Sequence, residues 1–374
     1  MSTYANTRPP MAPGVHTLPA AYYSDPGQYQ REMRHIHSEM WLWAGRAKQV
    51  EKPGDFFAQQ VAGANVIVVR GEDGAVRAFH NVCRHRGTLL CNEESGAFPG
   101  RIRCPYHAWT YDFSGRLVGA PHMDRVEGFR EQDHPLGDVA CTVWDGHVFI
   151  NLSARPMPFA QHVGELAERL RPWRMEELER VERRVYAVRA NWKLIVQNYS
   201  ECLHCPVAHP LLHEQSHYMS GENDPPTATW MGGHMELRDG VETLSMDGRS
   251  GGSCLPALRA PQSREVHYYA LLPNLLLNLH PDYMLTITLW PRGVDRTDVV
   301  GDWHFHPDAI RRPGFDPHGA IDFWDLTNRQ DWELSERAQA GITSRGYRPG
   351  PYSNREELLH AFDRFVQDRT DGRT

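Results

Sequence analysis

The pattern of hydrophobic and polar positions changes between helix-like and strand-like spacing along the chain. These changes divide the sequence into three parts. Between residues 48 and 152, β-rich arms flank X-Gly pairs at Asp73-Gly74, Ser114-Gly115 and Asp145-Gly146. Such pairs between β-rich arms are the strongest short-range signal for β-hairpins. We therefore expect a compact all-β domain over residues 48–152, which ends at the linker-like segment "NLSARPMP".

The part before this domain, residues 1–47, begins with a proline-rich arm over residues 1–20 that orders only against the rest of the protein. The segment "DPGQYQREMRHIHSEMWLWAGRA" then carries a helix-start signal. We expect one helix over this segment, packed through Met33, Ile36 and Met40.

The part after the β domain, residues 153–374, contains both helix-like and strand-like segments. "FAQHVGELAERLRPW" is helical, and "RRVYAVRANWKLIVQNYSECLHC" is a strand that continues into a helix. Strand-like segments occupy residues 227–305, and a long helix begins near Ile321. This arrangement predicts an α+β domain in which a long helix packs on a sheet.

Composition narrows the function classes. The 374 residues carry a net charge of −7, which argues against a nucleic-acid or anionic-membrane partner. The most apolar region, residues 268–290, is interrupted by prolines, asparagines and an aspartate, and predicts buried strands rather than a membrane span. The N-terminus lacks a signal-peptide core, and the seven cysteines do not form a secreted disulfide pattern. We expect a cytoplasmic protein.

Two Cys–His pairs lie inside the β domain. Cys83 and His85 are separated by one residue, and Cys104 and His107 by two. Both zinc and a Rieske [2Fe–2S] cluster use these ligand types, although zinc modules usually pair Cys-x-x-Cys with spaced histidines. Four unliganded residues at this spacing are improbable.

The segment "CRHRG…CPYHAW" resembles the Rieske motif. The resemblance implies that Cys83 and Cys104 hold one iron and that His85 and His107 hold the other, with Trp109 shielding the cluster. Neutral imidazoles in place of two thiolates raise the reduction potential of such a cluster. Cys91 matches no ligand position, and we interpret it as a buried thiol.

A second cluster, "NYSECLHCPVAHP", lies in the α+β part. Cys202, His204, Cys205 and His209 are suitable ligands for zinc, whereas two histidines with a carboxylate suit mononuclear iron(II). Glu201 and His204 share one helix face, but His204 and His209 are five residues apart and converge only if the helix is distorted. Pro206 supplies a cause for that distortion.

This stretch resembles the catalytic motif of the Rieske non-heme iron oxygenases. The resemblance implies that His204 and His209 bind iron and that Cys202 and Cys205 are not ligands but small buried side chains. It also implies a helix-grip-like catalytic domain, with a curved antiparallel sheet and a long C-terminal helix. The relatives include the α subunits of ring-hydroxylating oxygenases and the choline and betaine monooxygenases.

A carboxylate must complete the iron site. The long helix offers Asp322, Asp325, Asp331 and Glu333, and periodicity alone does not choose among them. The family pattern, an acid a few residues ahead of Glu-x-x-Gln, aligns with Asp331. Asp325 remains the alternative.

The resemblance also assigns the electron path. An acid at the position of Glu201 links a Rieske histidine, here His107, of one subunit to the iron histidine His204 of the next. This path implies a homotrimer. Asn198 is expected near the iron. Electrons come from a separate flavin reductase or ferredoxin, and NAD(P)H acts only through that partner, because the chain shows no nucleotide-binding fingerprint.

The expected function is an oxygenase that uses O2 to hydroxylate, dihydroxylate or demethylate a small organic substrate, with an aromatic compound favoured. The alternative substrate is a quaternary ammonium compound, for which aromatic side chains would provide cation–π contacts. A Rieske electron carrier or redox sensor with a degenerate second domain is the non-enzymatic alternative, and a zinc-stabilised module is a third.

Overall fold

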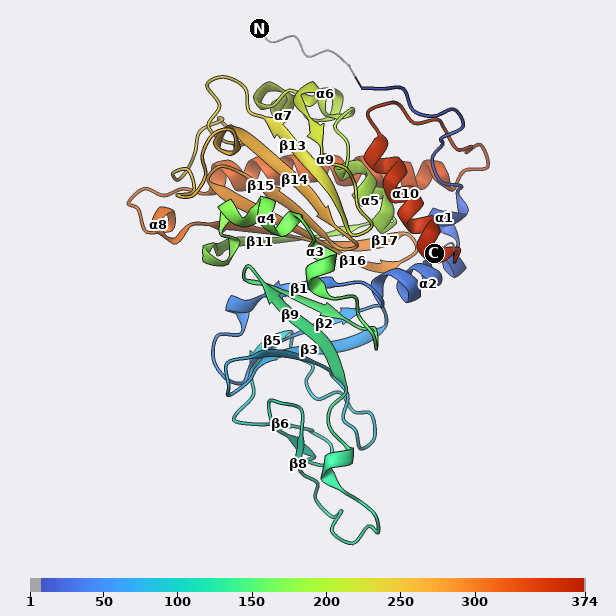
Figure 1. Ribbon diagram of the computed structural model, residues 1–374, viewed down its shortest axis with the longest axis vertical. Coiled ribbons are helices and arrows are strands. Elements are labelled where there is room, and N and C mark those ends of the chain that lie inside the picture. The colour runs from blue at the N-terminus through green and yellow to red at the C-terminus, as the bar shows by residue number, and fades with distance from the viewer. Residues whose placement is uncertain (1–7, 373–374) are drawn as a thin grey trace. The chain divides into compact units, whose positions relative to one another are not determined.

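The computed structural model describes residues 8–372 and divides the chain into two compact units (Figure 1). The first comprises residues 37–159 and is called the Rieske unit because it contains the segment that resembles the Rieske motif. The second, the catalytic unit, combines the segment up to residue 36 with the chain from residue 160. The start of the proline-rich arm, residues 1–7, lies outside the described residues.

The Rieske unit contains two antiparallel sheets. The larger has the order β1-β10-β9-β4-β3-β2-β5, and the smaller has the order β6-β7-β8. Their bounds are β1 Leu42–Arg46, β2 Asp55–Val61, β3 Ala64–Arg70, β4 Val76–His80, β5 Ser95–Ala97, β6 Ile102–Arg103, β7 Thr110–Tyr111, β8 Leu117–Gly119, β9 Asp138–Trp144 and β10 His147–Asn151.

All three expected hairpins are present. They join β3 to β4, β7 to β8, and β9 to β10. Gly74, Gly115 and Gly146 have φ angles of 80°, 82° and 77°. Glycine adopts this left-handed region without a steric penalty, which explains why the X-Gly pairs identified the turns.

The expected helix before the β domain is shorter than the sequence indicated. Asp25 caps helix α2 (Pro26–Glu32) by accepting a hydrogen bond from the Gly27 N–H, and a π-helical turn follows at Met33–His37. The predicted last part of the helix is instead strand β1, which pairs with β10. Tertiary pairing thus overrides the local helical pattern, and the structure divides the units at residues 36/37 and 159/160 rather than at 47/48 and 152/153.

The catalytic unit is built on one curved antiparallel sheet of order β11-β17-β16-β15-β14-β13-β12 (Figure 1). The apolar run at residues 268–290 lies within its three consecutive central strands, as buried strands around turns. The strands are β11 Glu179–Val188, β12 Glu222–Asn223, β13 Trp230–Glu236, β14 Glu265–Leu271, β15 Leu275–Leu279, β16 Tyr283–Gly293 and β17 Arg296–Phe305.

The long helix α9 (His318–Ile342) packs on this sheet. Its Trp324 ring lies 6.4 Å from the Tyr268 ring on β14, and its Trp332 ring lies 6.1 Å from the Tyr186 ring on β11. The other helices are α1 Ala21–Ser24, α3 Phe159–Val163, α4 Leu166–Leu170, α5 Trp192–Tyr199, α6 Cys205–Ala208, α7 Pro210–Gln215, α8 Pro307–Ile310 and α10 Glu357–Thr370. The antiparallel sheet and long helix confirm the α+β prediction.

A buried polar network joins α2, α5 and α10. Lys193 Nζ donates to both Glu32 carboxylate oxygens, at 2.6 and 2.7 Å, and both side chains are fully buried. Gln197 donates to Asp363 at 2.6 Å, and the Tyr352 hydroxyl donates to the same carboxylate at 2.7 Å. Buried charged groups are tolerated only when they are paired in this way.

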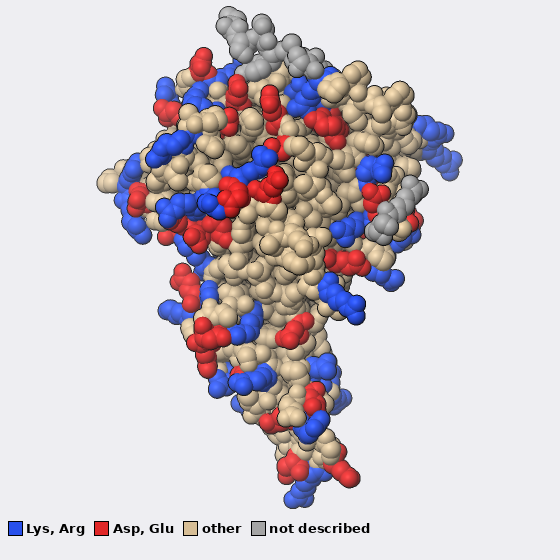
Figure 2. All heavy atoms as spheres, in the orientation of Figure 1, with Lys and Arg blue, Asp and Glu red and all other residues tan. Residues whose placement is uncertain are grey.

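Acidic and basic side chains are intermixed on the face of the molecule seen in Figure 2. A nucleic-acid surface would instead require a continuous basic patch. No helix within residues 8–372 has the length and apolar character that crossing a membrane requires.

Candidate functional site

The first candidate site lies on two loops of the Rieske unit. In each loop the backbone N–H four residues after a cysteine donates to that cysteine's carbonyl, from Gly87 to Cys83 at 3.0 Å and from Ala108 to Cys104 at 3.2 Å. Gly87 and Ala108 both have positive φ, at 75° and 59°. The two loops therefore have the same backbone turn, although their sequences differ.

The side chains of these loops fit a cluster with two sulfur and two nitrogen ligands. Cys83 and Cys104 are 2% and 3% exposed, whereas His85 is exposed and His107 half-buried. The two imidazole rings lie 4.9 Å apart. Buried sulfurs beneath accessible imidazoles match the Cys₂His₂ ligation of a Rieske cluster, with the histidine side available for electron exchange.

Neighbouring groups support these ligands. Trp109 is buried and stacks on His85 with a centroid distance of 4.8 Å, consistent with the expected shielding. Burial, together with the nearby Cys83 thiol, raises the pKa of Cys104, while the backbone N–H groups of Tyr106 and His107 act in the opposite direction. N–H groups directed at a sulfur also tune the potential of an iron–sulfur cluster.

Cys91 has no place among these ligands. It is buried and forms no disulfide, its thiol donates to Asn81 Oδ1 at 3.9 Å, and burial raises the pKa of the thiol to about 11. This environment agrees with the sequence interpretation of Cys91 as a buried thiol.

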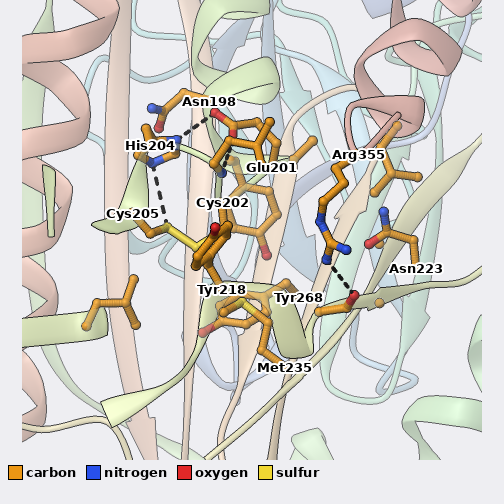
Figure 3. A pocket seen from close by; sticks show the side chains of 18 of the residues that line it. Asn198, Glu201, Cys202, His204, Cys205, Tyr218, Asn223, Met235, Tyr268 and Arg355 are labelled. Atoms are coloured by element: carbon orange, nitrogen blue, oxygen red, sulfur yellow. Dashed lines mark hydrogen bonds and ion pairs between the residues drawn. A yellow bond between two sulfur atoms is a disulfide. The ribbon is translucent and has the colours of Figure 1, made fainter. Parts of the chain in front are cut away.

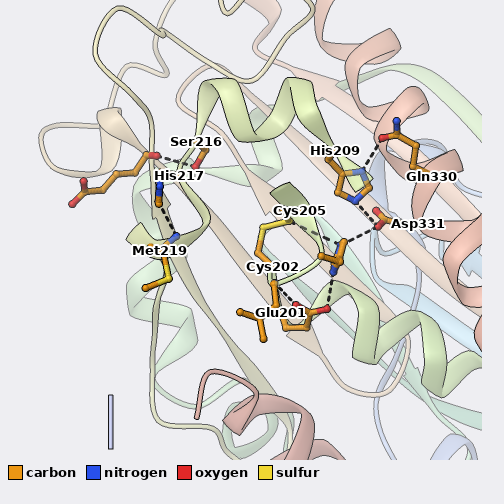
Figure 4. Close-up of a disulfide and its surroundings, with 12 residues drawn as sticks. Glu201, Cys202, Cys205, His209, Ser216, His217, Met219, Gln330 and Asp331 are labelled. Carbon is orange, nitrogen blue, oxygen red and sulfur yellow. Dashed lines mark hydrogen bonds and ion pairs between the residues drawn. A yellow bond between two sulfur atoms is a disulfide. The ribbon is translucent and has the colours of Figure 1, made fainter. Parts of the chain in front are cut away.

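The second candidate site joins the "NYSECLHCPVAHP" stretch to α9 (Figure 4). Potential ligand atoms of His204, His209 and Asp331 all lie within 4.8 Å of one another. Asp331 Oδ1 is 2.8 Å from His209 Nε2 and 3.3 Å from His204 Nε2. The structure therefore brings together the three residues expected to bind iron.

Local backbone breaks explain how the two histidines converge. Helix α5 ends at Tyr199, and Pro206 lies in the first turn of the new helix α6, where its missing N–H breaks no helical hydrogen bond. His209 links α6 to α7 with φ −127° and ψ 69°, which is not helical. The expectation of one helix distorted by Pro206 was wrong, because the chain forms separate short helices.

Each histidine has a partner on its Nδ1 atom. His204 Nδ1 hydrogen-bonds Glu201 Oε1 at 2.6 Å, and His209 Nδ1 hydrogen-bonds Gln330 Oε1 at 2.7 Å. These contacts leave both Nε2 atoms facing Asp331. Metal-binding histidines are typically oriented in this way by an acceptor on the second ring nitrogen.

The electrostatics of the site favour a cation. Burial opposes charge on His204, but its hydrogen bonds to Asp331 and Glu201 raise its pKa to about 10. Burial likewise opposes charge on Asp331, yet His204 and His209 lower its pKa. Two carboxylates beside two imidazoles leave excess negative charge, and a divalent metal would neutralise it.

A second group of two histidines and one carboxylate, on β13 and β14, has a different balance of charge. His267 Nε2 lies 3.0 Å from Glu265, and His234 Nε2 lies 3.8 Å from the same carboxylate. Burial dominates and lowers the pKa of His267. With one carboxylate for two imidazoles, this group has less negative charge to attract a metal than the site at His204.

Asp325, the alternative third ligand, lies elsewhere. It forms ion pairs with Arg184 and Arg329, at 2.9 Å each, and accepts a hydrogen bond from the Tyr186 hydroxyl at 2.6 Å. Six residues along a helix correspond to a rotation of about 600°, so Asp325 and Asp331 point to different sides of α9. The structure therefore does not bring Asp325 together with His204 and His209.

Cys202, in the loop after α5, forms a disulfide with Cys205, the first residue of α6, and their Cα atoms lie 5.0 Å apart (Figure 4). The prediction that they are merely small buried side chains was incomplete, because the tight loop brings their sulfurs together. Sulfurs bonded to each other cannot bind zinc as thiolates, so the zinc site of Cys202, His204, Cys205 and His209 considered from the sequence lacks two of its four ligands. This arrangement disfavours the zinc interpretation.

One cavity contains this site (Figure 3). Asn198 lies in its wall next to His204, as expected, and the rings of Tyr218, Tyr268 and Trp324 also line it. Gln330, Tyr268 and Arg355 were not singled out from the sequence. Gln330 adjoins Asp331 in the chain, but no local pattern indicates that its amide reaches His209.

Comparison with known proteins identifies both units. The family model of the Rieske [2Fe-2S] domain matches residues 40–130. That of the ring hydroxylating alpha subunit (catalytic domain) matches residues 175–372.

The chain is 34% identical to the glycine betaine monooxygenase oxygenase subunit of Chromohalobacter salexigens, covering 92% of this chain and 83% of that one. It is 29% identical to the carnitine monooxygenase oxygenase subunit of Acinetobacter pittii, covering 89% and 86%.

Solved structures support the same family assignment. A quaternary ammonium Rieske monooxygenase, described as revealing carnitine oxidation and inter-subunit electron transfer, aligns with a TM-score of 0.81 and 26% identity over 95% of both chains. Naphthalene 1,2-dioxygenase from Rhodococcus sp. has a TM-score of 0.76 at 18% identity over 94% of both chains, which shows a shared fold. The chain thus belongs to the Rieske non-heme iron oxygenases, oxidoreductases that use a Rieske [2Fe–2S] cluster, a mononuclear iron and O2.

Proposed function

We propose that this chain is the oxygenase subunit of a monooxygenase that acts on a quaternary ammonium compound. The observation that carries the proposal is the 34% identity, over most of both chains, to a glycine betaine monooxygenase subunit. The aromatic substrate favoured from the sequence has weaker support, since the naphthalene dioxygenase resemblance stands at 18% identity. The cavity rings of Tyr218, Tyr268 and Trp324 suit a methylated ammonium group through cation–π contacts.

The proposed ligands are Cys83, His85, Cys104 and His107 for the cluster, and His204, His209 and Asp331 for the mononuclear iron. When bound, the iron supplies O2 activation with electrons delivered through the cluster. Asp331 provides one carboxylate oxygen toward both Nε2 atoms, and Gln330 and Glu201 keep the imidazole rings in place. Asn198 is proposed to contact substrate or solvent in the same cavity.

Glu201 is proposed to serve the electron path as well. Its 2.6 Å hydrogen bond to His204 supplies one half of the expected link. The other half would come from His107 of a neighbouring subunit, in a homotrimer. The description of inter-subunit electron transfer in the solved relative supports this part of the proposal. A separate flavin reductase or ferredoxin would provide the electrons.

A single-turnover assay tests the substrate class without the unidentified reductase. Protein reduced with dithionite, freed of excess reductant and mixed with O2 should convert glycine betaine or carnitine, and mass spectrometry should detect the oxidised or demethylated product. Naphthalene should give no product under the same conditions. Turnover of naphthalene with neither ammonium compound converted would contradict the proposal.

A further inference from the structure

Two arginines line one part of the cavity wall. One of them lies in the segment just before α10, and the other lies near the start of the described residues. Arg355 and Arg8 both line the cavity that contains His204, His209 and Asp331. Figure 3 shows Arg355 beside Asn223, on the side of the view away from His204 and Asn198. A guanidinium is not needed to bind an aromatic hydrocarbon, and it repels a simple cation, so its presence constrains the substrate.

The two arginines differ in how their charge is balanced. Arg8 forms an ion pair with Glu357 and donates to the Gly221 carbonyl at 2.8 Å. Among the described residues, the Arg355 guanidinium donates only to backbone carbonyls, at 3.3 Å to Gly221 and 3.5 Å to Met219. Among residues 8–372, no carboxylate oxygen lies within 4.0 Å of the Arg355 guanidinium. Arg355 is thus a partly buried cation whose charge no adjacent carboxylate neutralises.

The pKa of Arg355 reflects this imbalance. Burial lowers it, Arg8 lowers it further, and Glu357 only partly compensates. A carboxylate brought into the cavity would therefore gain a charge-assisted and potentially bidentate partner, the geometry for which a guanidinium is best suited.

Another part of the cavity wall is aromatic rather than charged. The Tyr268 ring lies 6.3 Å from the Tyr199 ring and 6.4 Å from the Trp324 ring. The Tyr268 hydroxyl is buried and has no hydrogen-bond partner among the described residues. Aromatic faces attract a methylated ammonium group, whereas the guanidinium attracts a carboxylate.

We propose that the substrate is a zwitterion, a quaternary ammonium carboxylate, and that Arg355 binds its carboxylate while the N-methyl groups face the site of His204, His209 and Asp331. This inference rests on the proposed function and refines it. It predicts discrimination against choline, which has an ammonium group but no carboxylate. Arg355 is then a specificity-determining residue.

The test compares ligands and variants in the full-length holoenzyme. The wild type should bind and convert glycine betaine or carnitine at least about tenfold better than choline or glycine betaine methyl ester, both of which lack the carboxylate. Arg355→Gln should raise KM for the zwitterion by about 10- to 100-fold, with a smaller change in kcat. Arg355→Lys, which keeps the charge, should recover part of the affinity.

The matched control is Arg348→Gln. Arg348 lies in the same segment and is exposed, and within residues 8–372 its guanidinium also donates only to backbone carbonyls, those of Arg345 and Tyr347. Its substitution should leave KM unchanged.

The outcomes separate the two proposals. Equal use of choline, the methyl ester and the zwitterion by the wild type would overturn the carboxylate inference and leave the proposed function intact. If no quaternary ammonium compound is converted, both fail. If Arg355→Gln does not fold, the comparison of glycine betaine with its methyl ester in the wild type still decides the inference.

Discussion

The two metal-binding regions of this chain are assembled in opposite ways. In the Rieske unit, all four proposed ligands lie on two loops between Cys83 and His107, each closed by the same backbone turn. In the catalytic unit, His209 and Asp331 are 122 residues apart and meet only because α9 packs on the sheet. The first site is therefore a local property of the sequence, whereas the second depends on the tertiary structure.

The largest effect expected from this difference is that the second site can be destroyed without harming the first. Asp331→Ala should abolish turnover and mononuclear iron binding, because it removes the carboxylate shared by both Nε2 atoms. The Rieske absorption and EPR signal should remain. Asp325→Ala, on the other side of the same helix, is the control and should retain the iron. Normal activity in Asp331→Ala would remove that residue from the ligand set.

The next largest effect concerns the connection between the two regions. Glu201→Gln should leave both metals bound but slow product formation by roughly 10- to 100-fold, the usual cost of altering a partner of a metal ligand. Rapid-reaction spectroscopy should locate the delay in reoxidation of the cluster. An unchanged rate would exclude Glu201 from the electron path.

A smaller effect is expected from substitution of Gln330, the residue of α9 that hydrogen-bonds His209. Gln330→Ala removes the acceptor of the His209 Nδ1 hydrogen bond, so iron affinity should fall by about tenfold. Competition with an iron chelator measures this change. Gln330→Glu, which keeps an acceptor, should retain tight binding, and equal affinities in both variants would show that the hydrogen bond has no role.

The smallest effect concerns stability of the catalytic unit. Burial raises the pKa of Asp363 to about 7, although Tyr352, Gln197 and Lys193 act against this rise. The folded state therefore retains a proton that the unfolded state releases near pH 4. Stability should fall as pH rises from about 4 through 7, by on the order of 1 to 4 kcal/mol.

Asp363→Asn should remove this pH dependence, measured by urea unfolding of the catalytic unit at pH 5 and pH 7.5. Asp368→Asn, at a more exposed position of the same helix, is the control and should keep the dependence. The same decline in both variants would assign the effect to other groups.

The contrast also explains how much the sequence alone revealed. The hairpins and the Rieske motif were readable because turn glycines and ligand spacing are local signals, and the α+β class and the oxygenase family were confirmed. Strand β1 was missed because its pairing with β10 is not encoded in its own pattern. Periodicity did not choose Asp331 over Asp325, since only the packing of α9 determines which carboxylate faces His204.

Partners that depend on tertiary contacts were also missed. Gln330 and Arg355 lie in helical and loop segments without any distinguishing local pattern, and the Cys202–Cys205 disulfide depends on a break between two helices. The substrate preference shifted from aromatic to quaternary ammonium compounds because of the relatives, and the charge of Arg355 adds a physical reason to favour a zwitterion.

The central claim is that one chain holds two separate iron centres. The most direct test is the iron and acid-labile sulfide content of anaerobically prepared protein, with EPR after dithionite reduction. The account predicts about three irons and two sulfides per chain together with a Rieske signal. Two irons that persist after reconstitution with iron(II), or zinc in a colourless protein, would contradict it.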